Sequence, residues 1–198
     1  PTVNIGEALY TSGVALTRRL DGSYTIALSG LAIMEFTPQG IRYAKEFMPM
    51  FIKRIKAVQV SAGKSFFHGP ESLQRWQNDQ VSPMERLRIL DPAANKKWVN
   101  SALAQVRSLF PQLAGIQLAS SWGSYVDCTP DAVPVMSEVP ELEGFYIAAG
   151  CSGHGFGLGP GLAKVAADLV VNKTPAIDAS PFSLSRLVDG SKLKVGAL

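Results

Sequence analysis

The stretch Gly150-Cys151-Ser152-Gly153-His154-Gly155-Phe156-Gly157-Leu158-Gly159-Pro160-Gly161 places six glycines among twelve residues. A short apolar run, 145–149, precedes it. Apolar residues at helical spacing follow it, at Leu158, Leu162, Val165, Ala166 and Leu169. This order predicts a buried strand, a glycine-rich loop and a helix that ends near Asn172.

Such a loop suits a ligand, because glycine adopts positive φ and lets a backbone approach closely. The free N–H groups at the start of the helix favour an anion or a polarised carbonyl. Two phosphate motifs fail, since Leu158 stands where GxGxxG needs its last glycine and Phe156 stands where a Walker loop needs lysine. A tight strand–helix turn with glycines for packing is the alternative interpretation.

Upstream, residues 3–28 predict strands, with Asp21-Gly22 as a hairpin turn. A helix is expected from Thr37, with Pro38 in its first turn and with Pro49 kinking or splitting it. A second helix is expected from Asp91-Pro92, and a strand over 116–126.

The composition is that of an ordinary globular protein, with 46% hydrophobic and 18% charged residues and a net charge of +3. The bases are scattered, which argues against nucleic-acid binding. No apolar run approaches the roughly 20 residues of a membrane span. Cys128 and Cys151 form no metal-type cluster, so we expect no metal. Two reduced thiols suggest a cytoplasmic protein, with one buried disulfide as the alternative.

Three motifs carry a family resemblance, and they keep their order over residues 122–186. The first, Gly150-Cys151-Ser152-Gly153-His154-Gly155-Phe156, is similar to a Gly-x-Ser-Gly-His-Gly-Phe signature. The segment from Trp122 through Thr129-Pro130-Asp131 resembles a Trp-x-Gly stretch ending in Thr-Pro-Asp. Pro181-Phe182 to Arg186 resembles a closing Pro-Phe-x-x-x-Arg. Together they resemble the D-amino-acid-oxidase-type FAD-dependent oxidoreductases, which include sarcosine and glycine oxidases.

The resemblance implies a mixed α+β fold with an antiparallel-sheet substrate domain. The last βα unit of a glutathione-reductase-like FAD-binding domain would follow it. We therefore expect residues 1–120 to form part of the substrate domain, 121–175 the end of the FAD domain, and 176–198 a C-terminal tail. The family's N-terminal GxGxxG half has no counterpart here, so we expect a second polypeptide to supply it. The chain would then be a separate subunit, a cleavage product or a deletion variant.

The resemblance also implies a site. Backbone N–H groups from Gly153 to Leu158 would face flavin N1 and the C2 carbonyl, and His154 would hold the loop or touch the flavin. A histidine satisfied by backbone groups is the alternative. The expected cofactor-binding residues are Gly150, Cys151, Ser152, Gly153, His154, Gly155, Phe156, Gly157 and Leu158. Trp122 and Tyr125, with His154, are the catalytic candidates, and Tyr24 and Arg42 are the substrate-binding candidates.

Three departures from the family pattern refine this expectation. Ser124 stands where sarcosine-oxidase-like members carry the cysteine that bonds to FAD, so we expect non-covalent FAD. Val126 stands where glycine-oxidase-like members carry a carboxylate-binding arginine. This favours an amine substrate, or an amino acid held by another residue such as Arg42. Gly157 replaces a lysine near the flavin, which leaves oxidase and dehydrogenase both open.

The expected function is oxidation of a C–N bond of a small amine or amino acid to an imine, by hydride transfer to FAD N5. This chemistry needs positioning more than a side-chain base. A non-catalytic interaction subunit that keeps the fold without flavin is the alternative. A third possibility is a phosphate-binding enzyme of unrelated fold, for which only Lys164 lies close in sequence.

Overall fold

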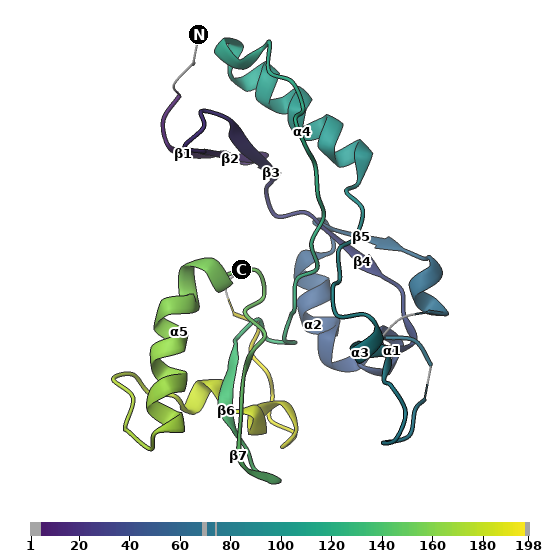
Figure 1. Ribbon diagram of the computed structural model, residues 1–198, viewed down its shortest axis with the longest axis vertical. Coiled ribbons are helices and arrows are strands. Elements are labelled where there is room, and N and C mark those ends of the chain that lie inside the picture. The colour runs from purple at the N-terminus through teal and green to yellow at the C-terminus, as the bar shows by residue number, and fades with distance from the viewer. Residues whose placement is uncertain (1–4, 69–70, 74, 197–198) are drawn as a thin grey trace. The chain divides into compact units, whose positions relative to one another are not determined.

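The computed structural model describes residues 5–68, 71–73 and 75–196 of the chain (Figure 1). These residues form two compact units, each discontinuous in sequence. The first unit comprises Pro1–Met34, Ala57–Ser61 and Arg75–Tyr125, and the second comprises Glu35–Lys56, Ala62–Gln74 and Val126–Leu198. Helices and strands occur in both, so the mixed α/β class is confirmed.

The first unit contains an antiparallel sheet in the order β1-β2-β3, formed by Ala8–Tyr10, Val14–Arg18 and Tyr24–Leu28. Strands β2 and β3 form the predicted hairpin, in which Arg18 pairs with Tyr24. Gly22 has φ +84° in the connecting turn. The Asp21 carboxylate accepts hydrogen bonds from both the N–H and the hydroxyl of Ser23.

Helix α4, Lys96–Leu109, covers one face of this sheet. Val14 and Leu16 of β2 are fully or almost fully buried, and they form a core with Val106 of α4 and Leu113 of the 3-10 turn Pro111–Leu113. The helix begins after Asn95, whose side chain accepts the N–H of Trp98. The predicted start at Asp91 was therefore wrong, because the capping side chain lies four residues further on.

Residues 116–126, predicted as a strand, form no strand among the described residues. A strand requires a hydrogen-bonded neighbour, and the described part of the chain offers none there.

The strands β4, Ala32–Glu35, and β5, Val58–Ser61, pair with each other as a two-stranded sheet. The short helix α3, Pro83–Arg86, starts with a capping box between Ser82 and Glu85.

Helix α1, Pro38–Arg42, starts as predicted, because the Thr37 hydroxyl accepts the N–H of Gly40 and Pro38 occupies the first turn. Helix α2 follows as Ala44–Arg54. The interruption falls at Tyr43, whose φ of −104° and ψ of 14° leave the helical region. Pro49 lies inside α2, so the helix does not split at this proline, and the alternative of a kink there stays a prediction. The 3-10 turn η1 spans Lys64–Phe66.

The C-terminal part of the second unit is a hairpin with a helix packed on it. Strand β6, Val135–Val139, pairs antiparallel with β7, Leu142–Ala149. Helix α5, Gly155–Val170, contacts both strands and buries Val165 and Asp168. It ends just before Asn172, which has φ +56°. Two 3-10 turns follow, η3 at Ser180–Phe182 and η4 at Leu184–Leu187.

The chain leaves much surface exposed. Its accessible area is 14432 Å². Even two separate compact domains of half its mass would together expose only about 11,000 Å². Large apolar side chains account for part of the excess, since Phe145, Ile52 and Phe156 are 54%, 62% and 103% exposed. The described residues therefore present several large apolar side chains at the surface of the chain.

Candidate functional site

The glycine-rich loop leaves strand β7 through a left-handed turn. Gly150, Ser152 and Gly153 have φ values of +76°, +50° and +88°. The N–H of His154 donates to the carbonyl of Cys151 at 2.9 Å and closes the turn. Left-handed backbone is unfavourable for a non-glycine residue by about 1–2 kcal/mol, so Ser152 must be held there by its surroundings.

The segment before strand β6 holds this turn. The Asp127 carboxylate accepts the N–H of Gly150 at 2.6 Å, and the Asp127 carbonyl accepts the N–H of Ser152 at 3.0 Å. The Ser152 hydroxyl donates to the Gly150 carbonyl at 3.2 Å and accepts the N–H of Thr129 at 3.3 Å. A Cβ at position 150 would lie 2.5 Å from Thr129 Cγ2. Glycine is thus required here both by φ and by space.

The first turn of α5 has uncommitted amides. His154 is the N-cap residue, and its side chain makes no capping hydrogen bond. Among the described residues, the N–H groups of Gly155, Phe156 and Gly157 have no hydrogen-bond acceptor. The N–H of Leu158 is used by the His154 carbonyl, at 3.0 Å. Three amides therefore lie at the positive end of a 16-residue helix.

This narrows the expected set of donors. Of the N–H groups from Gly153 to Leu158, those of His154 and Leu158 are engaged within the chain. The other four remain for a ligand: Gly153, Gly155, Phe156 and Gly157. They can donate to an anion or to a carbonyl oxygen on which negative charge develops.

The glycines of α5 leave space beside these amides. A Cβ at Gly157, Gly159 or Gly161 would meet nothing within 4 Å in this chain. Glycine inside a helix is less stable than alanine by about 1 kcal/mol, and packing within the described chain gives no reason for it. A bound group or a second polypeptide close to the helix would explain the missing side chains.

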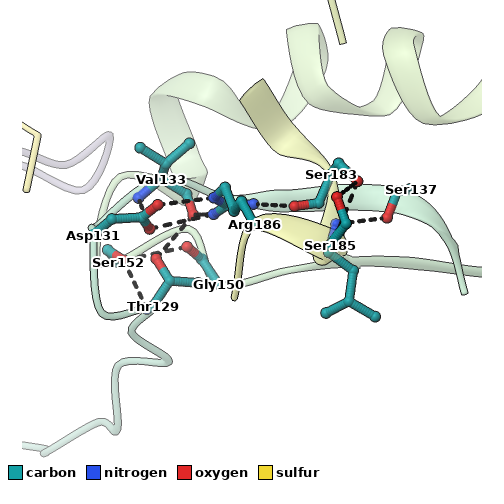
Figure 2. Close-up of polar contacts among 10 residues, drawn as sticks. Thr129, Asp131, Val133, Ser137, Gly150, Ser152, Ser183, Ser185 and Arg186 are labelled. Carbon is teal, nitrogen blue, oxygen red and sulfur yellow. Dashed lines mark hydrogen bonds and ion pairs between the residues drawn. The ribbon is translucent and has the colours of Figure 1, made fainter. Parts of the chain in front are cut away.

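A second feature fastens the loop before β6 to the C-terminal segment (Figure 2). Arg186 forms an ion pair with Asp131, with 2.8 Å from Nε to Oδ2 and 3.2 Å from Nη2 to Oδ1. Its guanidinium also donates to the carbonyls of Ser183 and Val133. The Leu184 N–H donates to the Ser137 hydroxyl, which fixes the same segment on β6.

Burial raises the pKa of Asp131, but the hydrogen bonds from Arg186 and the Val133 N–H, with the charge of Arg186, outweigh it. The pKa of Asp131 therefore lies below its ordinary value of 3.8.

The backbone of Asp131 also holds the C-terminal tail. Asp131 is 3% exposed, and the N–H of Gly196 donates to its carbonyl at 2.9 Å. Lys53 donates to the Val195 carbonyl at 2.9 Å, so the tail is fastened twice.

The predicted substrate-side residues are divided between the units. Tyr24, Trp122 and Tyr125 belong to the first unit, and Arg42 and His154 to the second. The Tyr24 ring packs against the β2–α4 core, and its hydroxyl accepts the N–H of Ile5 at 3.3 Å. Trp122 and Tyr125 are 60% and 50% exposed.

Arg42 is exposed, and its guanidinium lies 5.6 Å from the centre of the Tyr43 ring. His154 is also exposed, and its side chain has no hydrogen bond in the described part of the chain. The alternative of a histidine satisfied by backbone groups is thus not what the structure shows. Cys151 is half-buried and Cys128 exposed, and both are free thiols.

Sequence reasoning did not single out Asp127 or the pairing of Asp131 with Arg186. The ion pair joins two of the quoted motifs across 55 residues, so their co-occurrence was a usable signal. Asp127 had no comparable signal. Among the described residues no group of His, Cys, Asp and Glu could hold a metal ion, and no helix has the length and apolar character to cross a membrane.

Comparison with known families gives a match over residues 51–169, more than half of the chain, to the model described as DAO, FAD dependent oxidoreductase. Among curated proteins, glycine oxidase of Geobacillus kaustophilus is 35% identical over 88 residues, which cover 44% of this chain and 23% of that protein. N-methyl-L-tryptophan oxidase of Salmonella typhimurium is 37% identical over 81 residues, covering 41% and 21%. The match thus spans less than a quarter of either relative.

Among solved structures, L-amino acid deaminase from Proteus vulgaris matches with a TM-score of 0.78 and 26% identity over 88% of this chain and 40% of that one. L-amino acid deaminase from Proteus myxofaciens, solved in complex with anthranilate, matches with a TM-score of 0.77 and 28% identity, covering 88% and 38%. The fold described above is therefore also found within these two chains, each of which is more than twice as long as this one.

The Asp131–Arg186 pair predicts a pH-dependent stability. We expect Asp131→Asn to lower the free energy of unfolding at pH 7 by about 3–5 kcal/mol, because Arg186 keeps its burial and loses its ionised partner. The pKa is lower in the folded state, so the contribution is complete above the unfolded value near pH 4 and disappears as the pH falls through the folded value. The gap between wild type and variant should therefore close at acid pH.

Urea unfolding of both proteins at pH 7 and pH 3 measures this gap. Asp189→Asn is the matched control, because this exposed carboxylate accepts hydrogen bonds from the side chain and the N–H of Ser191 in its own turn, and no cation contributes to its lowered pKa. A gap for Asp131→Asn that stays constant with pH would contradict the ion-pair account.

Proposed function

Since this chain belongs to the DAO family of FAD-dependent oxidoreductases, we propose that it is part of a flavoenzyme that oxidises a C–N bond of an amine or amino acid. The observation that carries the proposal is the set of uncommitted amides of Gly155, Phe156 and Gly157 at the start of α5, beside glycines with open space. The relatives, an oxidase of glycine, an oxidase of N-methyl-L-tryptophan and two L-amino acid deaminases, support the substrate class.

The residues present fit FAD. Bound FAD would supply the oxidation itself, taking a hydride at N5 from the carbon that bears the substrate nitrogen and leaving an imine for water to hydrolyse. The chain's contribution is electrostatic. The amides of Gly153, Gly155, Phe156 and Gly157 would donate to the pyrimidine edge and stabilise negative charge there, assisted by the helix dipole.

The remaining candidates supply the substrate side of the proposal. Within the first unit, the exposed rings of Trp122 and Tyr125 are the candidates for contact with the substrate, and Tyr24 is a weaker candidate because its ring packs against the core. Within the second unit, the exposed guanidinium of Arg42 is the candidate for binding a carboxylate. A Cβ at position 123 would lie 2.8 Å from the Pro92 carbonyl, so glycine is needed for the backbone next to Trp122 to lie this close to Pro92. Ser124 stands in the place of the covalent cysteine, so FAD would be held without a covalent bond.

We further propose the division expected from the sequence, with residues 1–120 in the substrate domain, 121–175 in the FAD domain and 176–198 as the tail. The two free thiols favour a cytoplasmic location.

A second polypeptide carrying the GxGxxG half would complete the fold, and α5 supports this. Most of its exposed residues are apolar, among them Phe156, Pro160, Ala163, Ala167 and Val170, and Lys164 is its one exposed charge. A helix that is apolar on both faces belongs in a protein interior. A surface hollow of about 230 Å³, partly open to solvent, also lies between α5 and the β6–β7 hairpin, lined by residues such as Met136, Ile147 and Ala166.

The proposal is tested on the protein purified with everything that binds it. We expect a yellow complex with flavin absorption, a second polypeptide in its intact mass spectrum, and FAD released into the supernatant by acid precipitation. Secondary amines and D- and L-amino acids are then screened for bleaching of the flavin band without oxygen. A colourless complex with the glycine loop intact would favour the non-catalytic interaction subunit instead.

Two glycine substitutions should have opposite effects on the chain. Gly157→Ala should stabilise it by up to about 1 kcal/mol, because alanine favours the helix and its Cβ meets nothing within 4 Å. The same methyl group should weaken FAD binding at least tenfold by standing beside the donating amides. Gly150→Ala should instead destabilise the chain, because of its φ of +76° and the clash with Thr129.

Thermal unfolding of the apoprotein and titration with FAD measure the two effects. A Gly157→Ala protein that is more stable and binds FAD as wild type does would place the flavin elsewhere.

A charge on the outer face of α5 should block association with the second polypeptide. We expect Ala163→Asp to change the stability of the chain alone by less than about 1 kcal/mol, the helix propensity difference. Copurification of the partner should fall at least tenfold, since an unpaired carboxylate would be buried. Ala104→Asp is the matched control, an exposed alanine on the polar face of α4. Equal copurification of both variants would show that α5 lies outside the interface.

A further inference from the structure

None of the sequence motifs assigns a role to Asp127. Its carboxylate accepts the N–H of Gly150 at 2.6 Å, and its carbonyl accepts the N–H of Ser152 at 3.0 Å. The contact spans 23 residues of sequence. One residue thus holds both ends of the left-handed turn that leads from β7 to the start of α5.

The turn needs such an external constraint. Gly150, Ser152 and Gly153 all have positive φ, and two of the three are glycines with many alternative conformations. A strained backbone conformation persists only where several surrounding contacts hold it in place. The Ser152 hydroxyl supplies one constraint through Thr129 and Gly150. Asp127 supplies the other, with the shortest hydrogen bond of the loop, made by an acceptor that carries charge.

The loop amides show what the constraint achieves. With the turn fixed, the His154 N–H is used by Cys151, and the chain enters α5 with the amides of Gly155, Phe156 and Gly157 free. If the Gly150 N–H lost its acceptor, the turn would gain other conformations. In these the same amides would point elsewhere. Orientation of these donors is what stabilises charge on a bound group without reorganisation.

Charge at Asp127 also influences its neighbour. Partial desolvation of the Cys128 sulfur, and after it the charge of Asp127, raises the pKa of this thiol above its ordinary value of 9.0, while a hydrogen bond with Ser152 and the charge of Arg54 lower it. Removal of the charge and removal of the hydrogen bond must therefore be separated in any test.

We propose that Asp127 is a positioning residue for the cofactor, one that fixes the Gly150–Gly153 turn through the Gly150 N–H and thereby aims the amides of Gly155, Phe156 and Gly157 at the flavin. The proposal rests on the proposed function, because it assumes that these amides face FAD. Asp127 itself acts only through the loop.

Two substitutions separate the hydrogen bond from the charge. Asp127→Ala and Asp127→Asn both remove the charge, but only asparagine keeps an acceptor for the Gly150 N–H. Asp178→Ala is the control, since this carboxylate in the same unit accepts the Ser180 N–H in an exposed turn remote in sequence from the loop. All proteins are prepared as the complete complex, and circular dichroism confirms that they are folded.

Three measurements are compared. Amide hydrogen exchange at Gly150 and Ser152 should be at least tenfold faster in Asp127→Ala, and less than threefold faster in Asp127→Asn. The FAD dissociation constant should rise in the same ratios. The flavin reduction potential should be more negative in Asp127→Ala than in Asp127→Asn by about 30 mV, which corresponds to a tenfold loss of preference for the reduced form. Asp178→Ala should match wild type in all three.

Equal potentials and equal FAD affinities in the alanine and asparagine variants would overturn the proposal, as would wild-type exchange at Gly150 in Asp127→Ala. Should Asp127→Ala not fold, Asp127→Glu moves the acceptor by one methylene and must exceed Asp127→Asn in exchange rate at Gly150. Absence of flavin from the wild-type complex would refute the proposed function, and the exchange data would still decide whether Asp127 fixes the turn.

Discussion

The structure around the candidate site depends on one backbone constraint, the left-handed turn at Gly150. The chain must leave β7 and start α5 within five residues, and it does so with φ +76° at a position where a Cβ would lie 2.5 Å from Thr129. No other residue type satisfies both conditions. The direction of α5, and hence the direction of its free amides, follows from this turn. The hydrogen bonds from Gly150 and Ser152 to Asp127 serve the same geometry.

The Asp131–Arg186 pair extends that constraint to the C-terminal segment. Thr129 packs against Gly150, and its hydroxyl donates to the Val133 carbonyl, which also accepts from Arg186. The pair is a buried charge interaction with further hydrogen bonds to carbonyls, the arrangement in which such a pair is specific as well as stable. Three segments that are distant in sequence are thereby joined at one turn: the residues before β6, the glycine loop and η4.

Local signals predicted the elements whose causes are local. The β2–β3 hairpin follows from Asp21-Gly22, the start of α1 from Thr37-Pro38, and α5 from its apolar spacing. The failures have non-local causes. Residues 116–126 have the composition of a strand but no neighbour to pair with in the described part of the chain. Pro49 lies inside α2, and the helix is interrupted at Tyr43 instead. Asp127 could not be found from spacing, because its importance lies in a contact with Gly150, 23 residues away.

The composition of α5 supports the proposed second polypeptide. Its inner face buries Val165 against the hairpin, yet its outer face is apolar as well, and its glycines face open space. A helix with this composition is poorly suited to a protein surface, since Lys164 is its one exposed charge and its four glycines lower its intrinsic helix stability. It suits a position between two layers, where one side packs on the hairpin and the other meets a second polypeptide. Glycine at Gly157 then has a physical reason, because a backbone without side chains lets a large planar group reach the amides directly. The proposed oxidation of a C–N bond would require little more of this chain than such a surface, since neither a metal nor a paired acid and base is needed to stabilise negative charge that develops at a ring edge.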